Sequence, residues 1–195
     1  MRNKLTLLLA ALLLTVTFLL AGCDGATPAP GQSGTAIPPK AAEQPSPAGT
    51  APNSESTMQL TVYHATKDAM YLVPEIHKVP VNSHPARTAI ELLLAGTKNT
   101  ELVGVMPAGV KLKNVKVKEH IAYVDFDDTL IKKNKGGSAG EILLVGAIVN
   151  TLTEFPDIQK VQILVGGKKV ETIAGHIDVS EPLSRSEQII KKITN

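Results

Sequence analysis

Residues 136–170 constrain the fold of this chain most, because a helix and a strand hairpin follow one another there without a gap. Ser138 and Glu141 have the Ser-x-x-Glu spacing of a capping box, in which both side chains accept backbone N–H groups at a helix start. We expect the helix to end at Pro156. Its large apolar residues recur every three or four positions and predict one buried face: Ile142, Val145, Ile148, Val149, Leu152 and Phe155.

A strand hairpin is predicted directly after this helix. Val161, Ile163 and Val165 alternate with other residues, as in a strand with one face turned to a core. The Gly166-Gly167 pair supplies the positive φ angles of a two-residue turn, and residues 168–173 form the expected return strand. The stretch therefore predicts a helix packed on an antiparallel sheet.

The preceding residues predict more elements of both kinds. Residues 60–79 indicate two strands, the second at a sheet edge because Pro74 cannot donate to a central ladder. Ser83 and Pro85 precede a second helical pattern, which ends at Gly96. Pairing of Lys118 with Ile121 would place the alternate apolar residues of 115–126 on one sheet face. The order predicts an α+β fold, in which two helices pack on a small, mainly antiparallel sheet with extra strands at both ends.

The N-terminal residues resemble a bacterial lipoprotein signal. Arg2 and Lys4 precede an uncharged apolar run over residues 5–20, and the sequence Leu-Ala-Gly-Cys follows at 20–23. The resemblance implies cleavage after residue 22, a lipid on Cys23 and a location on the extracytoplasmic face of the cell membrane. An uncleaved transmembrane anchor is the alternative.

Composition divides the remaining chain into a linker and one domain. Residues 23–57 contain seven of the thirteen prolines and few large apolar residues, which predicts a disordered tether. We expect the domain over residues 58–183 and a short amphipathic tail over 184–195. That tail has two alternative roles, contact with a partner or membrane, or packing on its own domain.

Charge and residue usage exclude several function classes. Arg2 and Lys4 lie in the signal, so the exported part keeps 18 of the 20 Lys and Arg residues. It also contains all 18 acidic side chains, so its basic and acidic side chains are equal in number. This balance, with 3% aromatic residues and no tryptophan, argues against a nucleic-acid surface. Cys23 is the only cysteine, so an intrachain disulfide and a cysteine zinc site are excluded.

Two polar clusters are candidate reactive or metal sites. Asp125, Asp127 and Asp128 lie together at the end of a predicted strand, but the further ligands of a calcium loop do not follow in register. We interpret them as a polar exit from the hairpin, in which one aspartate accepts local N–H groups. His176 and Asp178 would face one side of a strand, and a structural bond is favoured there over a metal or acid–base role.

No other pattern nominates a cofactor or a nucleophile. The glycine-rich residues 136–140 precede a helix but lack the Gly-Lys-Ser/Thr ending of a nucleotide loop, so a flexible helix entrance is preferred to a phosphate site. The five histidines have no His-x-x-His or His-x-x-x-His pair. We therefore expect no enzyme activity, no metal and no cofactor.

Five segments resemble the GerM family (GerMN domain) of sporulation and spore germination. They are residues 90–96 (IELLLAG), 106–109 (MPAG), 122–126 (AYVDF), 148–155 (IVNTLTEF) and 175–178 (GHID). The helix–strand–strand–helix–strand order also resembles the ring-building motif of that family and of ring-forming secretion proteins, which implies protein assembly. The resemblance carries no catalytic residues, and the chain has one such domain where the sporulation member has two in tandem.

Three functions follow from these observations. The first is a membrane-tethered, non-enzymatic domain that binds another envelope protein or itself, in sporulation, germination or cell-wall-associated assembly. The second is an envelope hydrolase or small-ligand binder that uses Asp125, Asp127, His176 and Asp178. The third is a peptidoglycan-binding domain with a groove beside the sheet.

Overall fold

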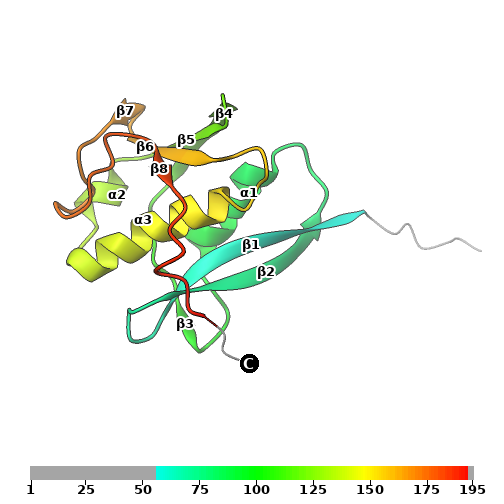
Figure 1. Ribbon diagram of the computed structural model, residues 1–195, viewed down its shortest axis with the longest axis horizontal. Coiled ribbons are helices and arrows are strands. Elements are labelled where there is room, and N and C mark those ends of the chain that lie inside the picture. Colours follow the sequence, from blue (N-terminus) through cyan, green and yellow to red (C-terminus); the bar gives the residue numbers. More distant parts are fainter. Residues whose placement is uncertain (1–55, 193–195) are drawn as a thin grey trace, which may run out of the picture. The chain divides into compact units, whose positions relative to one another are not determined.

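The computed structural model describes residues 56–192. The predicted signal over 1–22, Cys23 and the tether up to residue 55 lie outside the described residues, as do the last three residues of the tail. The described part contains two sheets and three helices, as expected for an α+β fold (Figure 1). In residues 56–192, no helix has the length and apolar character needed to cross a membrane.

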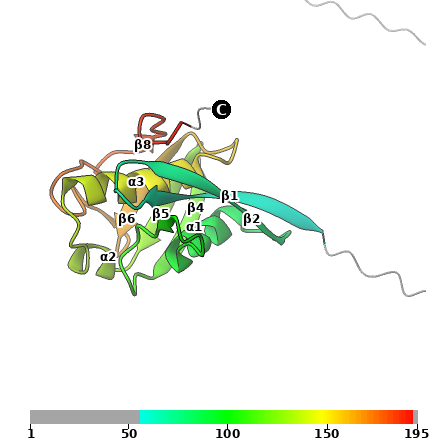
Figure 2. The same ribbon diagram turned by 90° about the horizontal axis from the view of Figure 1, so that it is seen from below.

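The first sheet has the order β2-β1-β3, formed by β1 (Thr57–Thr66), β2 (Leu72–Pro80) and β3 (Leu102–Val103). β1 pairs with both neighbours and is antiparallel to each. β2 lies at the edge, with Pro74 opposite Tyr63, as the proline predicts. The end of this hairpin where Thr57 meets Pro80 projects beyond the neighbouring elements (Figures 1 and 2).

The second sheet contains the predicted three-stranded layer. β4 (Leu112–Lys118) pairs antiparallel with β5 (Ile121–Phe126), and Lys118 lies opposite Ile121 as expected. β5 pairs with β6 (Lys160–Val165), and this pair is parallel because a helix crosses over between the two strands. The short strands β7 (Lys168–Lys169) and β8 (Leu183–Ser184) pair antiparallel with opposite ends of β6.

The return strand of the predicted β6–β7 hairpin is shorter than expected. Gly166 and Gly167 have φ angles of 61° and 79°, which confirms the two-residue turn. Only Lys168 and Lys169 then pair with β6, although the pattern predicted a strand up to residue 173. The chain leaves the sheet there because the next residues turn towards a helix end, where their N–H groups are bound.

Helix α1 (Pro85–Ala95) begins with the proline that the sequence predicts. It buries Ala89, Ile90 and Leu93. Gly96 follows with φ 77° and ψ −170°, a backbone conformation that residues with a Cβ rarely adopt. This glycine allows the chain to leave the helix towards β3.

Helix α3 (Ser138–Leu152) is buried on almost every side, which differs from the single apolar face that we expected. It lies with α1 between the two sheets, in contact with β1 and β2 on one side and with β6 on the other. Leu143, Leu144 and Ala147 are buried on the side of the helix that lies outside the predicted apolar face. A short helix, α2 (Thr129–Lys132), precedes it.

The described residues of the C-terminal segment, up to residue 192, pack on the domain. The Leu72 N–H donates to the Ile189 carbonyl at 2.7 Å, and the Lys191 N–H donates to the Leu72 carbonyl at 2.8 Å. Ile189 and Ile190 contact the core in this arrangement. Of the two predicted alternatives for the tail, its described residues adopt packing on their own domain.

Candidate functional site

Two of the aspartates at the end of β5 accept hydrogen bonds from the protein backbone. Asp125 Oδ1 accepts the Gly167 N–H at 2.7 Å, which joins the end of β5 to the turn after β6. Asp127 accepts the Lys111 N–H at 3.0 Å and the Thr129 hydroxyl at 2.7 Å. The bond from the Lys111 N–H is the main cause that lowers the pKa of the Asp127 carboxyl. Asp125 thus bonds a residue 42 positions away and Asp127 one 16 positions away, so both carboxylates connect separate segments, and only the Thr129 bond is local.

His176 and Asp178 lie on the loop between β7 and β8. The side chains of both residues are exposed. Asp178 Oδ1 accepts the Ser180 hydroxyl at 2.6 Å and the Ser180 N–H at 2.9 Å, and these bonds lower the pKa of the Asp178 carboxyl. In residues 56–192, neither of them nor Asp125 and Asp127 belongs to a group of three possible metal ligands within 4.8 Å.

Glu141 binds a distant loop, so the predicted capping box with Ser138 is wrong. The helix is preceded by Gly137 and has no side-chain cap. The fully buried Glu141 carboxylate instead accepts backbone N–H groups from Ile173 at 2.9 Å and from Ala174 and His176 at 2.7 Å. A carboxylate near the positive end of the α3 dipole is also favourably placed. Glu141 therefore fastens the loop that carries His176.

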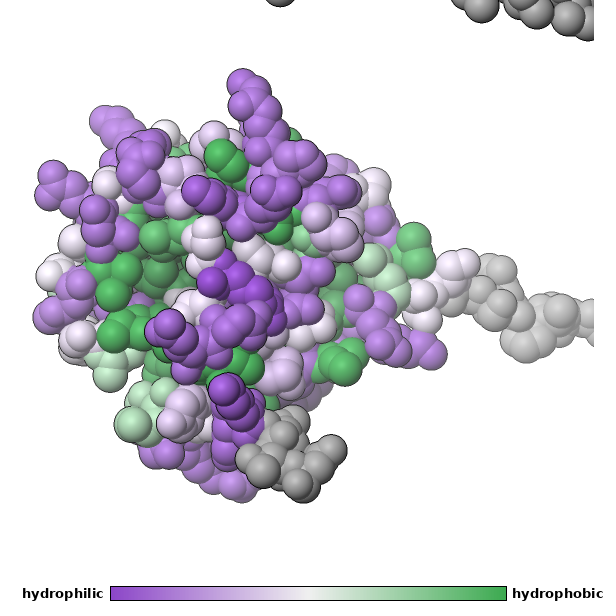
Figure 3. All heavy atoms as spheres, viewed as in Figure 1, coloured by the Kyte–Doolittle hydropathy of each residue, from purple (hydrophilic) through white to green (hydrophobic). Residues whose placement is uncertain are grey.

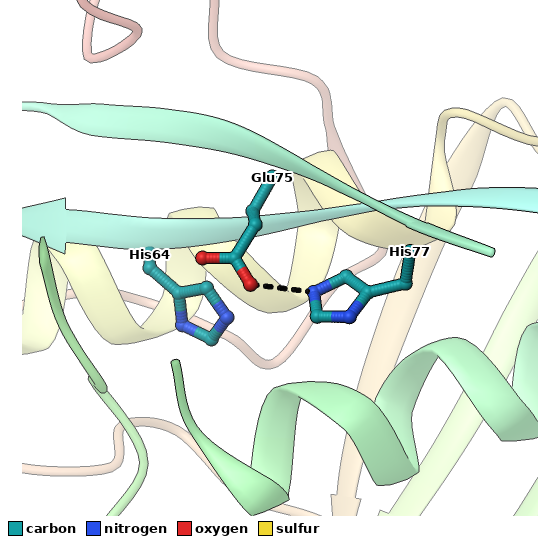
Figure 4. Close-up of side chains that lie close together, drawn as sticks. All are labelled: His64, Glu75 and His77. Atoms are coloured by element: carbon teal, nitrogen blue, oxygen red, sulfur yellow. Dashed lines mark ion pairs between the residues drawn. The ribbon is translucent and has the colours of Figure 1, made fainter. Parts of the chain in front are cut away.

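A further polar cluster lies on the β1–β2 hairpin, next to the loop after α1. His64 from β1 and Glu75 and His77 from β2 form the one group of three possible metal ligands in residues 56–192, with donor atoms within 4.8 Å of one another. Glu75 Oε1 lies 3.0 Å from His77 Nε2. Figure 4 shows the Glu75 carboxylate between the two imidazole rings.

The pairing of β1 with β2 explains why these side chains meet. His64 lies opposite Val73, so the next positions on the same face of β2 are Glu75 and His77. Because successive side chains alternate between faces, all three point to the same side of the sheet. The cluster is thus held by two paired strands, which place side chains more accurately than loops do.

Burial distinguishes His64 from the other two members of this cluster. The His64 side chain is fully buried, and neither ring nitrogen has a hydrogen-bond partner among the described residues. A buried donor without a partner costs about 1–3 kcal/mol, so such a group calls for an explanation. Burial lowers the pKa of the His64 imidazole and favours its neutral form. His77 and Glu75 are each 22% exposed.

A threonine outside the hairpin orients the carboxylate. The Thr97 hydroxyl donates to Glu75 Oε2 at 2.5 Å, while Glu75 Oε1 faces His77. Thr97 follows Gly96 at the end of α1, so this bond connects the hairpin to the helical layer. One carboxylate oxygen is therefore fixed by the protein and the other faces the histidines.

An apolar groove lies on the opposite sheet, along β4. It has a volume of about 650 Å³ and is lined by the start of α1, the side chains of β4 and the loop after α3. Val117 is 48% exposed there, and Val115, Phe155 and Ile158 add apolar surface. A smaller hollow of about 180 Å³ lies between α3 and the C-terminal segment. Figure 3 shows hydrophobic surface over the first half of α3.

Comparison with known proteins assigns this architecture to a family. The sequence model of the Germane family, described as sporulation and spore germination, matches residues 61–171. This chain belongs to the Germane family. The resemblance that the sequence motifs predicted is thereby confirmed.

One curated relative of this Germane-family chain is the spore germination protein GerM of Bacillus subtilis (strain 168). The two are 26% identical over 163 residues, which are 80% of this chain and 43% of GerM. The chain thus spans less than half the length of that relative. The first GerMN domain of B. subtilis GerM has a similar structure, with a TM-score of 0.57 and 26% identity over 66% of this chain and 98% of that domain.

The tandem GerMN domains of the same protein also match, with a TM-score of 0.57 and 24% identity. This match covers 66% of this chain and 46% of the tandem structure. Both structural matches support the predicted α+β fold. The matched Germane region includes the cluster of His64, Glu75 and His77 and all of β4.

Sequence reasoning missed the histidine cluster because it searched for metal-ligand spacings on single helices. The available signal was Glu75-x-His77 in an extended segment, which places both side chains on one face of a strand. His64 lies on the preceding strand, and only the register of the hairpin brings it to this pair. The Glu75-x-His77 spacing therefore nominates two of the three residues, and the register supplies the third.

Proposed function

We propose that this protein is a lipid-anchored, non-enzymatic domain that docks another envelope protein during sporulation or spore germination. Membership of the Germane family and the likeness to GerM support the biological setting. The lipoprotein-like residues 20–23 support attachment to the extracytoplasmic face of the membrane through a lipid on Cys23. The observation that carries docking is the open edge of β4 beside an apolar groove.

β4 offers backbone groups for pairing with another strand. It is the outermost strand of its sheet, and within residues 56–192 no strand pairs with its outer edge. The edge strand β2 of the other sheet contains Pro74 and Pro80, which lack the N–H needed for a ladder. β4 contains no proline, so its edge is the better suited of the two to accept an added strand.

The groove supplies side-chain contacts for a strand added at this edge. Val115 and Val117 lie on β4 itself, and Phe155 and Ile158 come from the loop after α3. In strand addition, main-chain hydrogen bonds provide affinity and adjoining apolar pockets select alternate side chains. The groove and the edge together therefore fit an extended segment with apolar residues at alternate positions.

Charge selects an acidic segment as the occupant. Lys111, Lys113 and Lys116 form no ion pair among the described residues, and residues 111–118 contain no acidic side chain. Pairing of two β4 edges would bring these lysines together, which disfavours a second copy of this chain. We therefore propose an extended acidic segment of a different envelope protein as the partner.

In vivo photo-crosslinking of the full-length chain tests this function. A photoreactive amino acid at Val117 lies in the groove, and one at Ile76 is the matched control because Ile76 is 66% exposed on the edge of the other sheet. In sporulating cells we expect a discrete adduct from position 117 that is absent from position 76. The double variant Lys113→Glu, Lys116→Glu should abolish this adduct.

Other outcomes of the crosslinking experiment would overturn the proposal. Equal adducts at positions 117 and 76, or none at 117, would exclude docking at the β4 edge. An adduct twice the mass of the chain would identify a second copy as the occupant. Lipidation has its own test, because Cys23→Ser should abolish incorporation of a labelled fatty acid into the protein.

A further inference from the structure

We propose that His64, Glu75 and His77 form a binding site for a divalent metal ion of the zinc class. This site lies on the β1–β2 hairpin, whereas the docking proposal rests on β4 of the other sheet. The metal proposal is thus independent of the proposed function. It assigns a ligand to the one cluster of the described residues that brings three suitable donor atoms together.

The donor set matches the chemistry of zinc. Two imidazoles and one carboxylate are the protein ligands of one group of zinc sites, which hold a water or another group in the fourth position. Bonds of about 2.0–2.2 Å in a tetrahedral site place ligand atoms roughly 3.3 Å apart. Glu75 Oε1 and His77 Nε2 are already 3.0 Å apart, and no donor atom of the three lies beyond 4.8 Å from another. Small side-chain rotations therefore close the site.

The unpartnered His64 ring is the observation that points to a ligand. This side chain is fully buried on the face of the sheet that also carries Glu75 and His77. Both of its ring nitrogens, and His77 Nε2, lack a hydrogen-bond partner with satisfactory geometry among residues 56–192. A metal bound between His64 and His77 would use one lone pair of each ring, and so would partner one of the two His64 nitrogens and His77 Nε2.

A purely structural cluster would leave these rings poorly satisfied. Glu75 Oε2 accepts the Thr97 hydroxyl and Oε1 lies 3.0 Å from His77 Nε2, which leaves the His64 ring without a hydrogen bond. A cation at the centre instead attracts the carboxylate and accepts electron pairs from both rings. The three side chains then share one partner, and the register of the hairpin already brings their donor atoms together.

Thr97 fulfils the role of an outer-shell group. Ligating carboxylates are commonly held by a further hydrogen bond, which fixes their orientation and tunes metal affinity. The short bond from the Thr97 hydroxyl to Glu75 Oε2 leaves Oε1 directed to the cluster. Because Thr97 follows α1, metal binding would also tie the hairpin to the loop between α1 and β3.

The site has access to solvent on one side. Glu75 and His77 are each 22% exposed, whereas His64 closes the inner side. A metal ion can therefore arrive from water, and the fourth position lies towards the surface. We expect an affinity that depends on all three ligands, since each contributes one of only three protein bonds.

Metal titration of the full-length chain in detergent micelles tests the proposal. The Cys23→Ser background removes the only thiol, which would otherwise compete for zinc. After treatment with a chelator, we expect calorimetry to give one Zn²⁺ per chain. Co²⁺ should give the intense visible absorption of a tetrahedral site, and Zn²⁺ should raise the melting temperature.

Three variants and one control connect the metal to these residues. His77→Gln and Glu75→Gln should each weaken Zn²⁺ binding by at least about 100-fold, and Thr97→Val by about 10–100-fold. His176→Gln is the matched control, because this exposed histidine lies outside the cluster and should leave affinity unchanged. Far-ultraviolet circular dichroism verifies that each variant is folded.

The result that would overturn the proposal does not depend on the folding of any variant. Absence of saturable Zn²⁺ binding by the Cys23→Ser chain would exclude the site. Equal binding by the parent, His77→Gln and Glu75→Gln would show that the metal binds elsewhere. Loss of binding in His176→Gln alone would assign it to the loop between β7 and β8.

Discussion

Glu141 and Ile173 are separated by 32 positions in the sequence, yet the Ile173 N–H donates to the buried Glu141 carboxylate at 2.9 Å. Two further N–H groups of the same loop, from Ala174 and His176, bind this carboxylate. A charged group with three donors is well compensated for its loss of water. The contact therefore links the start of α3 to the loop between β7 and β8.

Replacement of Glu141 should destabilise the domain strongly. Glu141→Ala leaves three N–H groups without their acceptor, and we expect a loss of about 3–5 kcal/mol in the free energy of unfolding. Glu141→Gln places an NH₂ group where one acceptor oxygen was, but it keeps the other oxygen as an acceptor. Its loss of unfolding free energy should therefore be smaller than that of Glu141→Ala. Urea denaturation of the full-length chain followed by circular dichroism measures both values.

The matched control for this prediction is Glu91→Gln. Glu91 is half-exposed and pairs with Arg87 one helical turn away, an interaction worth about 0.3–0.5 kcal/mol. Its loss should thus be several-fold smaller than that of either Glu141 variant. Similar losses at both positions would mean that the buried hydrogen bonds contribute little to stability.

Substitution of Ser138 tests whether this residue caps α3, as the Ser-x-x-Glu spacing predicts, or leaves Glu141 free to bind the distant loop, as observed. A working cap contributes about 1 kcal/mol, so a capping box would make Ser138→Ala destabilising by that amount. Because α3 has no side-chain cap, we expect a change within about 0.5 kcal/mol. A loss near 1 kcal/mol in the same urea experiment would restore the capping interpretation.

The parts of the fold that local patterns specify were predictable. Alternation of apolar residues and a two-residue turn leave one favourable register for β4 and β5, and Lys118 does lie opposite Ile121. Gly166 and Gly167 likewise specify the turn after β6. The capping box predicted from the Ser-x-x-Glu spacing was wrong, because a glutamate at this position caps the helix only when no other N–H group competes for its carboxylate. The competing donors come from a loop 32 residues later.

The candidate site depends on contacts between strands, which single-sequence patterns do not specify. His64 joins Glu75 and His77 only in the observed register, and a shift by one residue would turn it to the other face. Local patterns also do not specify where the first sheet lies. The second buried side of α3 could have been predicted from its apolar residues Leu143, Leu144 and Ala147. A helix that is apolar all round predicts a second covering layer.

Tyr63 predicts how stability depends on alkaline pH. Its hydroxyl donates to Glu154 at 2.7 Å and accepts from Arg185 at 2.6 Å. Burial, followed by the bond to Glu154, raises the pKa of Tyr63 from 10.0 to about 12. The folded state thus retains a proton that the unfolded state loses, and stability falls between about pH 10 and pH 12.

The difference in unfolding free energy between the native chain and Tyr63→Phe separates this effect from the titration of other groups at alkaline pH. Below pH 10 the contribution of Tyr63 is constant, and we expect it to fall by about 2–3 kcal/mol by pH 12 relative to Tyr63→Phe. Absorbance near 295 nm should show one tyrosine of the native chain ionising last, and Tyr63→Phe should lack that step. Parallel stability curves for the two proteins across this range would contradict the prediction.

Gly146 should show a mutational effect that depends on Ile189. A Cβ at Gly146 would clash with Ile189 Cδ1, so Gly146→Ala must displace this side chain. Because Cδ1 is the far end of a flexible side chain, the cost lies at the lower end of the about 1–3 kcal/mol of overpacking and roughly offsets the about 1 kcal/mol that alanine gains in helix propensity. We expect Gly146→Ala to be close to neutral in the native chain and stabilising in the Ile189→Ala background.

A double-mutant cycle measures this coupling, and hydrogen exchange locates it. The Leu72 N–H bonds to the Ile189 carbonyl, so its protection should fall in Gly146→Ala when the C-terminal segment is displaced. The Val62 N–H, in the core of β1, should keep its relative protection. Additive effects of the two substitutions would mean that the C-terminal segment does not pack on α3 through this contact, because residues in direct contact are those expected to couple.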